Sequence, residues 1–134
     1  MANAIYPKWK EAIMQAAANS SLGGTVKAAL VDTGTYTYSA AHEFQSSLTG
    51  VIGTPQTLAS KTYVNGTFDA ADVTVPAVTG STAEAIVIYI DTGTPATSRL
   101  VLYLDTSVTG LPVTPNGGDI NIAWNASGIF RLGA

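Results

Sequence analysis

Hydrophobic and polar residues alternate along most of the chain after residue 24, and Thr and Val are frequent in the alternating runs. This pattern is typical of short β-strands separated by turns. A series of about eight short strands at regular spacing favours an antiparallel β-sandwich or jelly roll over a parallel α/β sheet. The runs that predict strands cover residues 25–32, 54–64, 71–78, 84–91, 98–105, 111–125 and 129–132.

The N-terminal part of the chain has a helical period instead. Pro7 suits the first turn of a helix, and Asn19, followed by glycines at 23 and 24, predicts where the helix stops. We therefore expect one substantial helix over residues 5–18, docked on a sheet of the same chain or on a neighbouring subunit. Its apolar face would consist of Ile5, Tyr6, Trp9, Ala12, Ile13 and Ala16.

A short second helix is predicted over residues 40–48. Ser39 would be its N-cap, and Phe44 and Leu48 would face inward. With the N-terminal helix, this gives a mainly β fold with two helices of unequal length.

Two strand pairs are predicted from turn chemistry. Asn65-Gly66 is a strong signal for a tight hairpin, so residues 54–64 and 71–78 are expected to flank it. Pro76 places the second of these strands at an edge or ends it irregularly. Residues 84–91 and 98–105 form a matched pair whose nearly continuous hydrophobicity predicts the centre of the core.

The chain of 134 residues has no linker and no change of composition that would divide it. One domain is therefore predicted over residues 1–134, with an N-terminal helical segment at 1–24 and a sandwich at 25–134. Hydrophobic residues make up 46% of the chain, but charged residues only 11%, so the polar surface must come from Thr, Ser, Asn and Gly. A weakly charged surface suits a protein that is packed against neighbours.

Charge and cysteine content exclude several classes of protein. The net charge is −3 and the six basic residues are dispersed, so binding to nucleic acid or to a membrane surface is not expected. The absence of cysteine excludes disulfides, Cys-ligated zinc and thiol catalysis. Charges at Lys8, Lys10 and Glu11 interrupt the N-terminal apolar residues, so no signal peptide is predicted and synthesis in a cytoplasm is expected.

The sequence Asp-Thr-Gly occurs twice, at Asp32 and Asp91, each time after an apolar run. Aspartic proteases use two such aspartates, which share one proton. A third apolar run ends in Asp105-Thr106 without the glycine, which indicates that Asp-Thr is repeated here as turn chemistry. A two-lobed protease also needs a much longer chain, so we expect no protease activity and, more broadly, no enzyme.

Other candidate sites have weaker support. His42 is the only histidine, so a transition-metal site is not predicted, and a polar position on a short helix is the favoured interpretation. Asp69 and Asp72 lack the ligand density of a calcium loop, and a solvated turn is favoured. Trp9 and Trp124 lie on apolar faces and are expected in the core. No cofactor is predicted.

The segments YTYSAAHEF, FDAADVT and LPVTPNGGDI are the most specific parts of a pattern that covers nearly the whole chain. In this order the chain resembles small virion structural proteins of tailed bacteriophages. The resemblance implies a capsid decoration or cement protein, β-rich and jelly-roll-like, that binds the outer surface of the expanded capsid. The implied partners are the major capsid protein, whose neighbouring subunits it would bridge, and other copies of itself. The implied location is the capsid exterior of the virion, after synthesis in the bacterial host cytoplasm.

Five residues are the candidates for contacts with a partner, because chain termini are free to extend: Ile5, Tyr6, Trp9, Ile129 and Phe130. The alternative, that these side chains close the protein's own core, is favoured by burial tendencies.

Three other functions stay open. The first is a virion protein of the tail, baseplate or fibre. The second is a carbohydrate-binding module, with Tyr36 and Tyr38 as alternate residues on one strand face. The third is a small aspartic protease built on Asp32 and Asp91.

Overall fold

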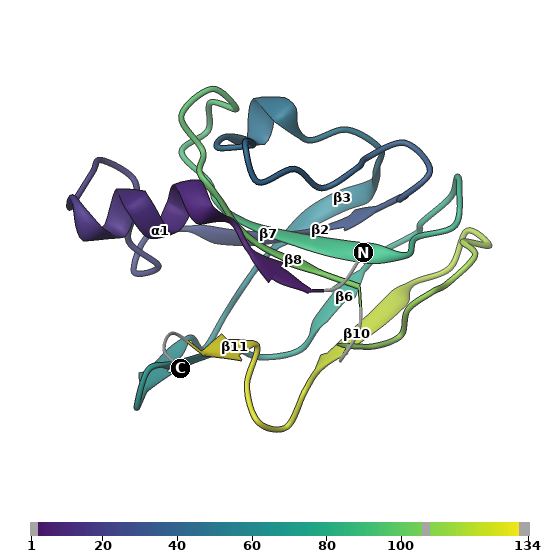
Figure 1. Cartoon of the computed structure of the whole chain (residues 1–134). Coiled ribbons are helices and arrows are strands. Elements are labelled where there is room, and N and C mark those ends of the chain that lie inside the picture. The colour runs from purple at the N-terminus through teal and green to yellow at the C-terminus, as the bar shows by residue number, and fades with distance from the viewer. Residues whose placement is uncertain (1–2, 106–107, 132–134) are drawn as a thin grey trace.

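The computed structural model describes residues 3–105 and 108–131. The fold is mainly β, with antiparallel sheets and the helix α1 (Pro7–Met14), as Figure 1 shows. The strands are β1 (Ala4–Ile5), β2 (Val26–Val31), β3 (Val51–Thr57), β4 (Thr62–Val64), β5 (Thr67–Asp69), β6 (Val73–Val75), β7 (Ala85–Ile90), β8 (Leu100–Leu104), β9 (Val108–Thr109), β10 (Ile120–Trp124) and β11 (Phe130–Arg131).

A five-stranded sheet with the order β1-β8-β7-β2-β3 is the centre of the molecule. Two three-stranded sheets, β6-β10-β9 and β11-β5-β4, lie on one side of it, and residues 33–50 cross its other side (Figure 1). Because the large sheet is covered on both faces, every residue of β7 and β8 is buried. The predicted pairing of these two strands is confirmed, with Ile86 opposite Leu104 and Val87 opposite Tyr103.

The buried side chains form one hydrophobic cluster that includes both the large sheet and the small ones. Ile86, Ile88 and Leu102 are at most 2% exposed and belong to its centre. Full burial of such a side chain contributes roughly 1.5–3 kcal/mol. The position of β7 and β8 in the core therefore agrees with the prediction from their hydrophobicity.

The helix is shorter than predicted. It begins at Pro7 and not at residue 5, because Ile5 belongs to β1 and pairs with Leu102 of β8. It ends at Met14, because Ala16 has a φ of 51° that is incompatible with a right-handed helix. Asn19, the expected stop signal, has a φ of 60° in the irregular segment that follows.

The predicted second helix over residues 40–48 is wrong, since the segment contains only a 3₁₀ turn at Gln45–Ser47. Its backbone bonds to the residues around the start of β8 instead: the Gln45 N–H donates to Ser98 O at 2.7 Å, and Glu43 O accepts from the Leu100 N–H at 3.0 Å. Ser39 caps a local turn, in which its Oγ accepts from the Ala41 N–H at 3.1 Å. Tertiary hydrogen bonds thus replace the helical ones that the sequence pattern predicted.

The tight hairpin at Asn65-Gly66 is confirmed, with φ values of 52° and 79° that fit a two-residue turn of the I′ type. Its returning strand is β5, however, and not residues 71–78 as predicted. The strand within 71–78 is β6, which pairs with β10 and ends at Val75. Pro76 follows directly, and β6 is an edge strand, as the proline predicted.

Candidate functional site

The two Asp-Thr-Gly segments lie at opposite ends of the large sheet. Asp32 follows the end of β2 and Asp91 follows the end of β7, and these strands are antiparallel, with Val31 opposite Ala85 and Val26 opposite Ile90. Five residues of an antiparallel strand span about 17 Å. At that separation the two carboxylates cannot share a proton, so Asp32 and Asp91 do not form the pair that an aspartic protease requires.

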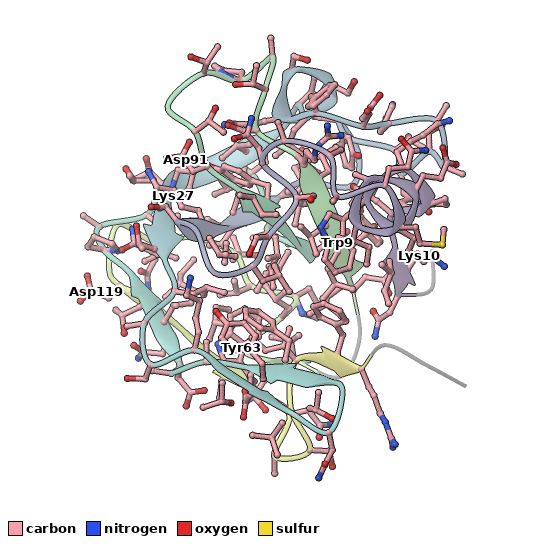
Figure 2. All side chains as sticks on the ribbon, turned by 90° about the vertical axis from the view of Figure 1, so that its left-hand side faces the viewer. Trp9, Lys10, Lys27, Tyr63, Asp91 and Asp119 are labelled. Atoms are coloured by element: carbon pink, nitrogen blue, oxygen red, sulfur yellow. The ribbon has the colours of Figure 1, made fainter. Side chains whose placement is uncertain are left out.

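Each of these aspartates builds its own turn. Asp32 Oδ1 accepts from the Gly34 N–H at 2.9 Å, and Asp91 Oδ1 accepts from the Gly93 N–H at 3.1 Å. Asp91 also forms an ion pair with Lys27, with 3.2 Å between Nζ and Oδ2, and the two lie side by side in Figure 2. The Gly93 hydrogen bond, and then Lys27, lower the pKa of Asp91 below its ordinary value, although partial burial opposes this.

A cluster of four tyrosines and one histidine lies between the large sheet and residues 33–50. The hydroxyls of Tyr6 and Tyr36 are 2.6 Å apart, and Tyr36 Oη is 2.8 Å from His42 Nδ1. Tyr38 packs on Tyr6 and Tyr103, with ring centroids 5.0 and 5.6 Å apart. Burial raises the pKa of Tyr6 far above its ordinary value, so this hydroxyl stays protonated.

This cluster changes the interpretation of two candidates. His42 is not on a helix; it bonds to Tyr36 in a half-buried position. Tyr36 is only 2% exposed, so it does not form an exposed aromatic platform with Tyr38 as a glycan-binding surface would require.

The five candidate contact residues lie in or against the protein's own core. Tyr6, Trp9 and Ile129 are 0%, 2% and 8% exposed, while Ile5 and Phe130 are half-buried and pack on the core. The rings of Trp9 and Phe130 meet edge to face at 5.8 Å. The N- and C-terminal segments therefore pack against each other. Their side chains help to close the protein's own core, which is the alternative that burial tendencies favoured. This leaves Ile5 and Phe130 as the two that are partly accessible.

An exposed apolar edge was not predicted. In β4, an edge strand of its sheet, Tyr63 and Val64 are 54% and 61% exposed. Tyr63 also lines an apolar groove of about 350 Å³ with Trp9 and Leu22, and its hydroxyl donates to Leu22 O at 2.8 Å. Figure 2 shows Tyr63 on the hairpin and Trp9 above it. The turn residues predicted this hairpin, but the sequence does not reveal which face of the hairpin is exposed to solvent.

An open hollow of about 660 Å³ lies at the end of the large sheet where β2 and β8 end. Its lining includes Tyr36, Tyr38 and Tyr103 and the acidic residues Glu84 and Asp105. Sequence analysis had singled out Tyr36, Tyr38 and Asp105 for other reasons, but not Glu84 or Tyr103. Residues 84 and 105 both stand at the open end of the predicted hairpin, but the register that pairs Ile86 with Leu104 extends to Ala85 opposite Asp105, so strand pairing alone does not predict that Glu84 and Asp105 line one hollow.

The remaining candidates are structural. Asp72 Oδ1 accepts from the Trp124 N–H at 3.0 Å, and Asp69 Oδ1 accepts from the Ala70 N–H at 2.9 Å. Among residues 3–105 and 108–131, no three His, Cys, Asp or Glu side chains are grouped so that they could hold a metal ion. No helix within these ranges has the length and apolar character that crossing a membrane demands. No protein-family model matches the sequence, and no curated protein matches it either.

Proposed function

We propose that this protein is a structural component of a tailed-phage virion, a decoration or cement protein on the outer surface of the expanded capsid. The resemblance of the sequence to small virion proteins supports the class. The observation that carries the proposal is a surface poor in charge that presents an open apolar edge, at Tyr63 and Val64 of β4. Such a surface suits permanent contacts with other proteins better than a free existence in solution.

Many of the few charged side chains are already engaged within the chain. Lys61 donates to the carbonyl oxygens of Leu22 and Gly24. Ion pairs engage six more side chains: Lys27 with Asp91, Arg99 with Glu43, and Lys8 with Glu11. The surface left for contacts is dominated by small polar residues and is well suited to close repetitive packing.

The mechanism of such a protein is physical. A sandwich-like or jelly-roll-like unit would be rigid, and each copy would bury a modest area against two or more subunits of the major capsid protein. Many weak contacts repeated over a lattice would add up through multivalency and oppose the internal pressure of the packaged DNA. Sites that align only after the shell expands would set the time of binding.

The deciding measurement is the copy number of the chain in purified particles of its phage, relative to the major capsid protein, by quantitative mass spectrometry. A ratio near one, or a simple fraction of it, is expected for shell decoration. A trace ratio would instead assign the protein to the tail, baseplate or a fibre. Absence from the particles would overturn the virion proposal altogether.

A further inference from the structure

The apolar groove beside Tyr63 is formed by three segments that are distant in the sequence. Trp9 and Ile13 contribute to it from α1, Leu22 from the segment that follows the helix, and Tyr63 from β4. Figure 2 views this face of the molecule. A smaller hollow of about 140 Å³ adjoins the groove, because Leu22 and Tyr63 line it too, together with Phe68. Apolar side chains therefore line one surface that extends from the helix to the hairpin.

The charged side chains at the rim of this groove are basic. Lys10 is exposed and stands three residues before Ile13, so the two lie on the same side of α1 (Figure 2). It forms no ion pair with any described residue. Lys61 stands directly before β4, and its ammonium donates to Leu22 O at 2.9 Å and to Gly24 O. Because an ammonium has three N–H donors, one remains for a carboxylate.

The acidic residues on the same elements face away from the groove. Glu11 pairs with Lys8 and stands two residues before Ile13, which at about 100° per residue puts it on the opposite side of the helix. Asp69 of β5 is paired in register with Thr62, so it lies on the opposite face of the hairpin from the ring of Tyr63. The residues outside the described ranges have no acidic side chain. The positive charge at the rim is thus not balanced by carboxylate side chains on the elements that form the groove.

The free edge of β4 adds backbone hydrogen-bonding groups to this surface. In the two-residue hairpin, Val64 and Thr67 flank the turn and exchange backbone hydrogen bonds, so Tyr63 and Phe68 are a non-hydrogen-bonded pair. The N–H and C=O of Tyr63 therefore point away from β5, and no strand in the described part of the chain pairs with this edge. An extended chain that pairs with the edge presents alternate side chains to the groove.

We propose that the groove and the edge of β4 bind an extended acidic segment of a partner protein. Apolar side chains of the segment fill the groove, and carboxylates on either side of them pair with Lys10 and Lys61. The basic rim selects this occupant, because a neutral or basic segment would cover both cations without pairing them. The inference deepens the proposed function and rests on it for one point, the source of the segment, which would be a subunit of the major capsid protein.

The site is tested on the isolated protein with a peptide probe, acetyl-Asp-Glu-Leu-Phe-Glu-Asp-amide. Its matched control is acetyl-Asn-Gln-Leu-Phe-Gln-Asn-amide, which has the same shape without the charges. The indole N–H signals of the two tryptophans are followed by NMR, because Trp9 lines the groove, whereas Trp124 donates to Ala71 O elsewhere in the fold. A saturable shift of the Trp9 signal alone is expected with the acidic peptide, and the affinity should fall as the ionic strength rises.

Two lysines on α1 form the first matched pair of variants. Lys10→Gln removes the unpaired cation at the rim and should weaken binding of the acidic peptide about two- to fivefold, as expected for an exposed ion pair. Lys8→Gln changes the net charge equally, but Lys8 is two residues away and lies on the other side of the helix. It should leave the affinity nearly unchanged.

Two exposed apolar residues form the second pair. Tyr63→Thr removes the ring from the groove and should weaken binding about five- to twentyfold. Val51→Thr removes an exposed apolar side chain from β3, an edge strand of the large sheet, and should have no effect. Tyr63→Thr also loses the hydrogen bond to Leu22 O, so its urea midpoint is measured as well. If it does not fold, the two lysine variants still decide the test.

Three kinds of result would overturn the site. Absence of a saturable Trp9 shift with the acidic peptide, or equal shifts with both peptides, would show that the groove does not recognise an acidic segment. Equal losses of affinity in Lys10→Gln and Lys8→Gln would show that the peptide responds only to the general charge of α1. A concentration-dependent dimer that Tyr63→Thr abolishes would make a second copy of the chain the occupant.

The site and the proposed function can fail separately. If the acidic peptide binds as expected but the chain is absent from particles, the site stands and the virion function falls. If the copy number is right but the acidic peptide does not bind, the function stands and this site falls. If both hold, Lys10→Gln should decorate stripped particles at lower occupancy than Lys8→Gln at equal protein concentration.

Discussion

The Tyr36 hydroxyl holds two partners at once, the Tyr6 hydroxyl at 2.6 Å and His42 Nδ1 at 2.8 Å. Tyr6 is fully buried and depends on Tyr36 for the only hydrogen bond its hydroxyl makes with described residues. Tyr36→Phe should therefore lower the free energy of unfolding by about 1–3 kcal/mol, because it leaves a buried hydroxyl unpaired. Tyr6→Phe should cost less, about 0.5–1.5 kcal/mol, because Tyr36 keeps His42. Urea unfolding at neutral pH compares the two, and an equal or larger loss for Tyr6→Phe would contradict the assignment.

Asp91 should make stability depend on pH in acid. Because its folded pKa lies below the ordinary value of 3.8, its carboxylate stabilises the folded state above that pH. This contribution is lost as the pH falls through the lowered folded pKa. Asp91→Asn should lower the free energy of unfolding by about 0.5–1.5 kcal/mol at pH 7, and the difference from the parent should shrink towards pH 2.

The control for this prediction is Asp119→Asn. Asp119 also accepts a backbone hydrogen bond, from the Ala77 N–H at 3.1 Å, but it is exposed and pairs with no described basic residue. At pH 7, Asp119→Asn should change the urea midpoint less than Asp91→Asn does, because it removes no ion pair with a described residue. A difference between Asp91→Asn and the parent that stays constant from pH 7 to pH 2 would exclude the proposed role of the Asp91 charge.

At the scale of elements, the end of β9 is held unusually close to β10. Gly110 has a φ of 114°, and a Cβ there would lie 2.5 Å from the backbone oxygen of Asn121. Gly93 has a similar φ of 87° but open space around it, so it is the matched control. Gly93→Ala should cost about 1–2 kcal/mol of unfolding free energy from backbone strain alone. Gly110→Ala should cost about 1–3 kcal/mol more, since the two strands must move apart. Similar losses in the two variants by urea unfolding would show that β9 and β10 can separate freely.

Elements were predictable where the local pattern and the tertiary environment agree. The strands around residues 84–91 and 98–105 are apolar throughout and are buried throughout, and Asn65-Gly66 forms the turn that its residues favour. The helix predicted over residues 40–48 does not form, because the backbone of this segment hydrogen-bonds to residues around the start of β8. No local sequence pattern reveals that partner. The predicted hairpin partner, residues 71–78, was wrong because β5 lies between the turn and this segment and pairs with β4, whereas β6 within 71–78 pairs with β10.

The candidate site was predictable only in part. Strand pairing places Glu84 and Asp105 at the same end of the predicted hairpin, but not on the same face of the sheet, because Ile86 pairs with Leu104 and successive side chains point to opposite faces. Two of the three tyrosines that line the hollow, Tyr36 and Tyr38, come from residues 33–50, whose irregular path over the sheet has no periodicity to interpret. The exposure of β4 depends on how three sheets are arranged, which is likewise a property of the whole fold.

At the scale of the whole molecule, the buried residues of all three sheets belong to one cluster, so the chain should unfold as one cooperative unit. The two tryptophans test this from different places: Trp9 lies on α1 and donates to Ser20 O at 3.0 Å, whereas Trp124 ends β10 and donates to Ala71 O at 2.9 Å. In Trp9→Phe only Trp124 fluoresces, and in Trp124→Phe only Trp9 does. Within each variant, the urea midpoint from fluorescence should equal that from far-ultraviolet circular dichroism. A Trp124 transition at distinctly lower urea would mean that β6, β9 and β10 unfold first, as a layer separate from the large sheet.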